Sequence, residues 1–141
     1  TVYAPADGLR RGGYVLWESA APPALLLIAT GSEVHITLEA ATRLADEGLA
    51  VRVVSLPCWE LFDAQPADYR AAVLPPAVRA RVAVEAGIAL GWERYIGPDG
   101  AMIGVPHFGA SAPGDAVMAH FGFTPERIIE VAKDVVRRVA R

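Results

Sequence analysis

Four residues that could bind or transform a ligand come at, or follow, apolar segments of this 141-residue chain: Ser32, Glu85, His107 and Ser111. If those segments are parallel strands, their carboxyl ends gather at one edge of a sheet, and ligands tend to bind beyond that edge. Ser32 would begin a helix there, and the helix amides could hold an anion. Glu85, if desolvated, could act as a general acid or base and could orient His107.

Three of these residues also have a structural explanation, which we favour. Serine is an ordinary N-cap residue, so Ser32 can simply begin a helix. A carboxylate such as Glu85 often pairs with an arginine or closes a loop, and a lone loop histidine such as His107 more often makes a structural hydrogen bond. Gly31 and Ser32 do not form a phosphate loop, because the Gly-x-Gly-x-x-Gly fingerprint is missing.

Cys58, the only cysteine, follows a predicted strand, a place where catalytic nucleophiles can stand. No nucleophile elbow of the Gly-x-Ser-x-Gly type surrounds it, so a hydrolase built on Cys58 or Ser32 is the weakest hypothesis. A single thiol forms no internal disulfide, which fits a reducing compartment and predicts a cytoplasmic protein. No His, Cys or acidic residues have zinc-ligand spacing, so we expect no metal site.

Large aromatic side chains concentrate in the predicted loops and short helices rather than in the long strands. Such residues can anchor a protein interface, or they can close the ends of the sheet over its core. The sequence does not decide between these two interpretations. The residues concerned are Trp59, Phe62, Trp92, Tyr95 and Phe108.

Composition narrows the class of protein. Hydrophobic residues make up 53% of the chain, above the roughly 45–50% usual in soluble domains, which indicates a well-filled core with apolar surface to spare for a partner. The net charge is −3 and no basic stripe is present, which argues against nucleic-acid binding. No apolar run reaches the roughly 18 residues that span a bilayer, so we expect no membrane partner.

The residues that could do chemistry must be positioned by alternating strands and helices. An unbroken apolar run over 24–29, ending in Thr30-Gly31-Ser32, predicts a strand buried on both faces. Further strands are expected over 14–18, 51–55, 81–86 and 101–104. The gap between the first two strands is too short for a crossover helix, so if they pair they should pair antiparallel.

Helices are expected between and after these strands. The first covers 33–47, with a buried face at Val34, Leu38, Ala41 and Ala45, and Gly48 ends it. The last begins at Thr124-Pro125-Glu126, where threonine is a suitable N-cap and proline suits the first turn. Its expected buried stripe is Ile128, Val131, Ala132, Val135 and Val139, and shorter helices are expected over 59–63, 67–73, near 92 and over 113–121.

The order of elements predicts a three-layer α/β/α sandwich around a mostly parallel sheet. We expect residues 1–13 to be a linker from a preceding domain and residues 14–141 to form one domain. The chain begins with threonine rather than methionine, so we expect a segment of a longer polypeptide.

In this order, the chain resembles the C-terminal domain of transketolase. Each motif is weak alone, but the ordered set is specific and covers nearly the whole chain. The motifs are Ala29-Thr-Gly-Ser-Glu-Val34, Val51-Arg-Val-Val-Ser-Leu-Pro57, Phe62-Asp-Ala-Gln65, Tyr69-Arg70, Val73-Leu-Pro75, Arg81-Val-Ala-Val-Glu-Ala-Gly87, Gly91-Trp-Glu-Arg-Tyr-Ile-Gly97, Phe108-Gly-Ala-Ser-Ala-Pro113 and Phe121-Gly-Phe-Thr124.

The resemblance implies a five-stranded mixed sheet with one antiparallel strand. It also implies a parent enzyme, a homodimer of the pentose phosphate pathway, that transfers a two-carbon ketol unit between sugar phosphates. Thiamine diphosphate, held through Mg²⁺ or Ca²⁺, supplies the carbanion chemistry in such enzymes. Their metal and diphosphate motif, Gly-Asp-Gly followed by asparagine, lies in another domain, and this chain contains no Gly-Asp-Gly and no asparagine.

We therefore expect no catalytic, cofactor-binding or metal-binding residue in this chain, and a structural role that supports the other domains and the homodimer of the parent. The alternative is a small-molecule regulatory module at the carboxyl edge of the sheet, lined by Ser32, Glu85, His107 and Ser111.

Overall fold

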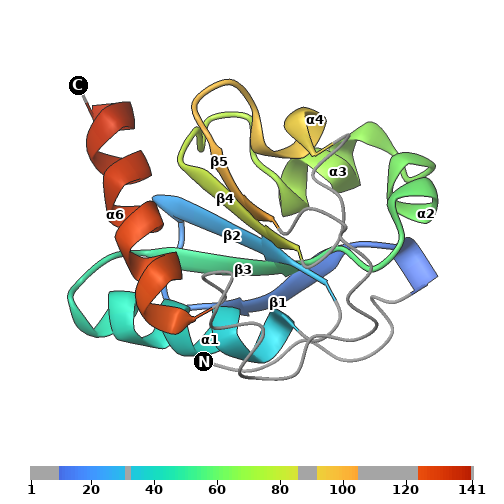
Figure 1. The fold of residues 1–141 in the computed structure, drawn as a ribbon. Helices are drawn as coiled ribbons and strands as arrows, with labels where there is room; N and C mark the ends of the chain where they lie inside the picture. Colours follow the sequence, from blue (N-terminus) through green and yellow to red (C-terminus); the bar gives the residue numbers. More distant parts are fainter. Residues whose placement is uncertain (1–9, 31–32, 86–91, 105–123, 141) are drawn as a thin grey trace.

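A five-stranded sheet forms the centre of the molecule (Figure 1). The computed structural model describes residues 10–30, 33–85, 92–104 and 124–140. The strand order is β1-β3-β2-β4-β5; β1 is antiparallel to β3, and the other pairs are parallel. The strands are β1 (Tyr14–Glu18), β2 (Leu25–Ala29), β3 (Val51–Ser55), β4 (Arg81–Glu85) and β5 (Ala101–Gly104). The predicted mostly parallel sheet with one antiparallel strand is confirmed.

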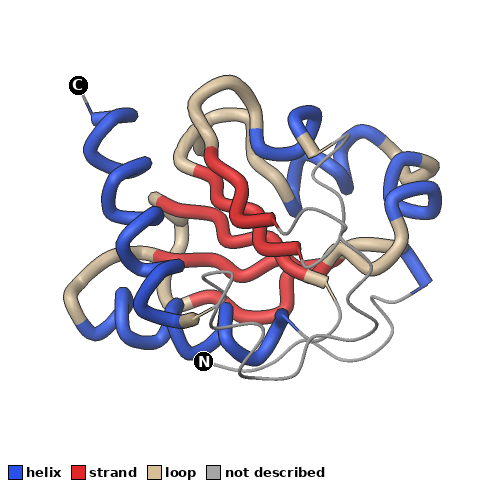
Figure 2. The backbone as a smooth tube through the Cα atoms, viewed as in Figure 1, coloured by secondary structure: helices blue, strands red, loops and turns tan. Residues whose placement is uncertain are grey.

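Helices cover both faces of this sheet, as the tube drawing shows (Figure 2). The long helices α1 (Val34–Asp46) and α6 (Pro125–Ala140) pack on one face. The short helices lie on the other face and are α2 (Trp59–Asp63), α3 (Ala67–Val73) and α4 (Glu93–Ile96). The structure thus confirms the three-layer architecture; the helix expected over 113–121 lies outside the described residues.

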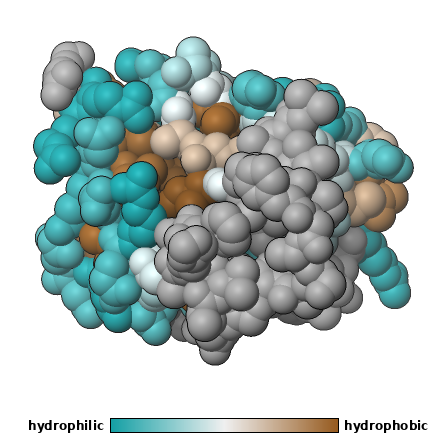
Figure 3. Space-filling model, in the orientation of Figure 1, coloured by the Kyte–Doolittle hydropathy of each residue, from teal (hydrophilic) through white to brown (hydrophobic). Residues whose placement is uncertain are grey.

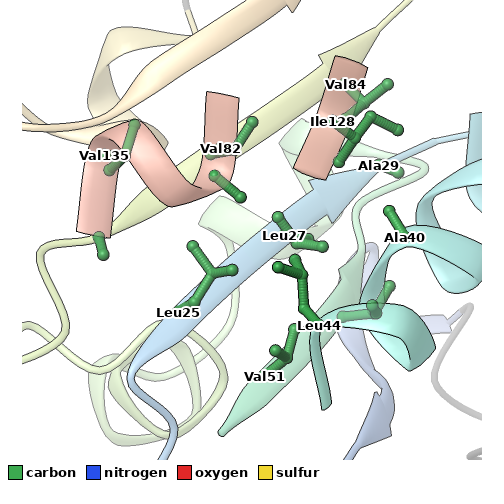
Figure 4. Packing of buried hydrophobic residues seen from close by; sticks show 14 of the residues in the cluster. Leu25, Leu27, Ala29, Ala40, Leu44, Val51, Val82, Val84, Ile128 and Val135 are labelled. Carbon is green, nitrogen blue, oxygen red and sulfur yellow. The ribbon is translucent and has the colours of Figure 1, made fainter. Parts of the chain in front are cut away.

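Strand β2 separates two hydrophobic clusters because all five of its side chains are fully buried. Leu25, Leu27 and Ala29 belong to the cluster under α1 and α6, and Figure 4 shows these residues beside side chains of both helices. Leu26 and Ile28 belong to the cluster under α2, α3 and α4. The alternation follows from the two-residue period of a strand, and it explains why the run 24–29 has no polar position.

The fully buried stripe of helix α1 shares only Ala41 with the predicted one. Its fully buried residues are Thr37, Ala40, Ala41 and Leu44, whereas Val34, Leu38 and Ala45 are only partly buried against the same cluster. The prediction missed Thr37 because a threonine reads as polar, yet its hydroxyl donates to the Glu33 carbonyl at 2.7 Å and can therefore be buried.

The two ends of α1 differ in how well the sequence predicts them. Gly48 has a φ of 94°, its amide donates to Ala45 O, and the Leu49 amide donates to Leu44 O, so the predicted glycine C-cap is confirmed as a Schellman motif. At the other end, Glu33 occupies the N-cap position without a side-chain cap hydrogen bond. Ser32, the predicted cap, lies outside the described residues.

Helix α6 begins as its sequence predicts. The Arg127 amide donates to Thr124 Oγ1 at 3.1 Å, which is the expected N-cap bond. Ile128, Ala132 and Val135 are fully buried, and Val131 and Val139 pack at the edge of the same cluster. Two ion pairs, Arg43–Glu126 and Lys133–Glu47, join α6 to α1. Figure 3 shows a hydrophilic outer surface over α6 with hydrophobic residues beside it.

Arg52 joins three elements on the other face of the sheet. Its Nε donates to Glu18 Oε2 of β1 at 2.6 Å, and its Nη1 donates to the Ala72 and Val73 carbonyls at the end of α3. The two charged side chains are 12% and 26% exposed, so the pair is shielded from water far more than a surface ion pair. A helix carboxyl end and a carboxylate both favour the cation placed between them.

The segment before β1 approaches α2 more closely than a side chain would permit. Gly12 has a φ of 77°, and a Cβ atom added there would lie 2.2 Å from Cys58 O and 2.4 Å from Phe62 N. Its carbonyl accepts a hydrogen bond from the Cys58 amide, and the Tyr69 hydroxyl donates to Gly13 O. Glycine at position 12 therefore lets the chain pack against α2 before it enters the sheet.

We predict that Gly12→Ala lowers the free energy of unfolding by about 3 kcal/mol or more, because it combines a left-handed backbone with a steric clash. Gly48→Ala is the matched control, since Gly48 also has a positive φ but no atom lies within 4 Å of an added Cβ. The control should lose only about 1–2 kcal/mol, the cost of the left-handed conformation. Urea unfolding followed by circular dichroism measures both values, and equal losses would contradict the packing argument.

Candidate functional site

The structure brings Thr30 and Glu85 together at the carboxyl edge of the sheet. Ala29 of β2 pairs with Val84 of β4, so the next residue of each strand lies at the same level. The Thr30 hydroxyl donates to Glu85 Oε2 at 2.8 Å, and the contact is partly buried. Thr30, which follows the apolar run over 24–29, thus meets Glu85 at this edge, and its hydroxyl gives the Glu85 carboxylate a structural partner.

The structure describes only some of the other residues at this edge. Ser55 ends β3 beside Ala29 at this edge and is 6% exposed. Ser32, His107 and Ser111 lie outside the described residues, as does Gly31. The proposed orientation of His107 by Glu85 stays a prediction.

The sequence analysis did not identify a second carboxylate at this edge, that of Glu33. Glu33 is 3% exposed, although a glutamate in the first turn of a helix usually faces water. Its amide donates to Thr30 O, which folds the strand end onto the start of α1. The available signal was its position directly after Thr30-Gly31-Ser32, where the positive end of a helix dipole favours a negative charge.

Cys58 holds a structural position before α2. Its amide donates to Gly12 O, its carbonyl accepts from the Phe62 amide, and its side chain is partly buried. In the part of the chain that the structure describes, no basic side chain bonds to its thiol, and no three His, Cys, Asp or Glu residues group as metal ligands. The contacts of Cys58 are those of a half-buried residue at a helix start.

Four of the five predicted loop aromatics form one cluster, which we call the aromatic cluster. It consists of Trp59, Phe62, Trp92 and Tyr95, whose rings meet edge to face; the Trp59 and Trp92 centroids are 4.8 Å apart. Phe62, Trp92 and Tyr95 are buried, so the cluster closes the face under α2 and α4. This arrangement favours the sheet-closing interpretation for these four; Phe108 lies outside the described residues.

The Tyr95 phenol is held between two charged groups at the border of the cluster. It donates to Asp63 Oδ1 at 3.0 Å and accepts from Arg94 at 2.7 Å, while Arg94 also pairs with Asp63. The Arg94 guanidinium lies 4.8 Å from the Tyr95 ring centroid and 5.2 Å from that of Trp59. Burial raises the pKa of Tyr95 above its ordinary value of 10.0, and the Arg94 hydrogen bond opposes this effect.

The comparisons with known proteins agree with this architecture. A family model described as "Transketolase-like TK C-terminal domain" matches residues 12–124. The chain is 55% identical to transketolase 2 of Escherichia coli (strain K12) over 128 residues, which are 91% of this chain and 19% of that protein. It is 49% identical over 129 residues to the transketolase of Geobacillus stearothermophilus, covering 90% and 19% of the two chains.

A solved structure gives the same result. The transketolase from Leishmania mexicana superposes with a TM-score of 0.85 at 42% identity, covering 96% of this chain and 19% of that one. The chain thus spans about a fifth of the length of the curated relatives it matches. None of the described helices combines the length and hydrophobicity needed to cross a bilayer.

We predict that the unfolding free energy falls as the pH rises above about 10, the ordinary pKa of tyrosine. The unfolded state releases the Tyr95 proton first, because burial raises the pKa of Tyr95 in the folded state. This contribution is present in full below pH 10 and is lost as the pH passes the folded pKa. Tyr95→Phe should flatten the decline, measured by urea unfolding between pH 8 and 11. An unchanged slope would contradict the assignment.

Proposed function

The chain belongs to the transketolase family, as its C-terminal domain, and from that premise we propose that it serves a larger enzyme as a structural, non-catalytic part. The parent would transfer a two-carbon ketol unit between sugar phosphates, with thiamine diphosphate and Mg²⁺ or Ca²⁺ held by its other domains. The domain would pack on those domains in the cytoplasm and support the parent homodimer. The observation that carries the proposal is the family match over 12–124.

The described polar groups at the carboxyl edge support a structural role. Thr30 donates to Glu85, and the Thr30 carbonyl accepts the Glu33 amide, so these groups hold β2, β4 and α1 together. The Thr37 hydroxyl completes the turn by donating to Glu33 O. Such bonds fix the positions of the strand ends relative to one another and to the start of α1.

The closed aromatic cluster supports the same conclusion. Trp92 and Phe62 are 1% and 2% exposed, and both lie between the sheet and the short helices. Edge-to-face contacts of this kind add stability beyond the burial of area alone. A closed layer of this kind suits a domain whose role is to hold its neighbours in place.

We predict that the 141-residue chain alone neither binds thiamine diphosphate with Mg²⁺ nor transfers a ketol unit. Isothermal titration calorimetry with both ligands should give only heats of dilution, and a coupled assay with sugar phosphates should give no rate above the buffer. Saturable heat with one site per chain, or turnover that survives repurification, would refute the non-catalytic assignment.

A chimera tests the positive half of the proposal. This chain would replace the matching C-terminal segment of E. coli transketolase 2, to which it is 55% identical. The chimera should remain a homodimer with kcat within about tenfold of the parent, a change of about 1.4 kcal/mol in the activation barrier. The control is the same enzyme without the segment, which should lose dimer stability in analytical ultracentrifugation.

The outcomes of the chimera experiment separate the two halves of the proposal. A folded, dimeric and inactive chimera would show that the replaced segment supplies a reacting group that this chain lacks. A truncated control that stays dimeric and stable would show that the domain does not support the dimer.

A further inference from the structure

A cavity of about 440 Å³ lies among α2, α3, α4 and the start of β4. Its size falls within the range of about 300–1,000 Å³ that is typical of small-molecule sites. We call it the arginine pocket, because three arginines line it. Its lining includes Phe62, Asp63, Arg70, Leu74, Arg81, Arg94 and Tyr95.

Arg81 is the fixed cation of the pocket. Its Nε donates to Val78 O, its Nη1 to Tyr95 O, and its Nη2 to the carbonyls of Leu74 and Pro75. Four bonds leave one of the five guanidinium N–H groups unused. Burial lowers the pKa of Arg81, and no carboxylate pairs with it among the described residues. The guanidinium is therefore oriented in advance and carries a charge that no described anion balances.

Arg70 and Arg94 add two more cations at the exposed rim. Arg94 is balanced by Asp63, at 2.7 Å. Arg70 donates from Nε to Gln65 O at 3.1 Å and has no carboxylate partner in the described part of the chain. Three arginines against one aspartate leave two uncompensated positive charges around one cavity.

We propose that the arginine pocket binds a small phosphate monoester, with its phosphate between Arg70 and Arg81. A phosphate monoester carries a charge of about −1.5 to −2 at pH 7, which matches the two unbalanced cations. Planar guanidinium groups suit phosphate oxygens because their N–H donors are spaced for paired hydrogen bonds. Phe62, Leu74 and Tyr95 form the buried apolar wall on which the organic part of the ligand would lie.

The position of this pocket separates it from the edge described above. Arg81 is the first residue of β4 and Glu85 the last, so the pocket and the Thr30–Glu85 contact lie at opposite ends of one strand. A purely structural role would explain Arg81, which donates hydrogen bonds to four carbonyl groups. It would not account for Arg70, whose single described bond goes to a neighbouring turn of the chain.

Phenyl phosphate and inorganic phosphate are the probes, titrated into the 141-residue chain by isothermal titration calorimetry at an ionic strength of about 0.1 M, where the Debye length is about 10 Å. Phenyl phosphate should bind at one site, and tighter than inorganic phosphate by about tenfold or more, because its ring buries apolar area against Phe62 and Leu74. Phenol, which has the ring without the charge, should give no saturable heat. Binding should weaken as salt screens the arginines.

Two variants test the location. Arg70→Gln removes one cation, and Ala71→Glu adds a carboxylate to the α3 wall of the pocket. Each should weaken phenyl phosphate binding by about tenfold or more, the scale of one charge-assisted hydrogen bond. Arg81 is left unchanged, because its loss would also release the carbonyls of 74–78.

Matched controls carry the same charge changes elsewhere. Arg138→Gln removes an exposed arginine of α6, and Ala72→Glu places a carboxylate one residue further along α3, outside the pocket lining. Both should bind phenyl phosphate within about twofold of the parent chain, since surface charges act weakly at a distance. Far-ultraviolet circular dichroism should show that all four variants are folded.

Two results would overturn the proposal. One is the absence of saturable binding of either phosphate probe to the folded chain at millimolar concentration. The other is binding that Arg70→Gln and Ala71→Glu leave within twofold of the parent, because the anion would then sit elsewhere on the surface.

Discussion

The burial of β2 on both faces is the constraint on which the rest of this structure depends. Its five side chains alternate between two hydrophobic clusters, and β3 and β4 take its backbone hydrogen bonds on either side. A strand in that position needs a layer of helices on each face, because either side chain row would otherwise meet water. The long pair α1 and α6 and the short group α2, α3 and α4 satisfy this requirement.

The same constraint divides the polar chemistry of the molecule between the two ends of β4. The three middle residues of β4 are fully buried, and its charged residues stand at its first and last positions, Arg81 and Glu85. At the carboxyl end, Glu85 meets Thr30, and Glu33 lies buried at the start of α1. At the amino end, Arg81 is surrounded by carbonyl groups and by the cavity under α3 and α4. The sheet thus has an acidic edge and a basic pocket, set by the direction of one strand.

Local patterns predicted the elements, and tertiary contacts explain what they missed. The strands over 14–18, 51–55 and 101–104 match the sequence pattern because each is a short apolar run between turn residues. The prediction of the buried face of α1 was incomplete because α6, which is distant in the sequence, packs against this helix. It also missed Thr37, whose hydroxyl donates to a backbone carbonyl and can therefore be buried. Thr30 and Glu85 were predictable from their strand ends. Arg81 was not, since its partner at Tyr95 lies fourteen residues away in the chain.

The exposed surface constrains how such a domain can support a larger enzyme. Among the large hydrophobic side chains of the described residues, Leu61 alone is exposed, at 46%. Other large apolar side chains in that part of the chain, Leu16, Ile36 and Met102 among them, are partly buried against the two hydrophobic clusters. Most of the hydrophobic residues lie in the two hydrophobic clusters inside the domain, and the aromatic cluster is part of the second of these. The exposed charged side chains of the described residues would form part of any contact with neighbouring domains, as in the polar rim of an interface. Association of that kind weakens with salt, because screened charges contribute less than buried apolar area.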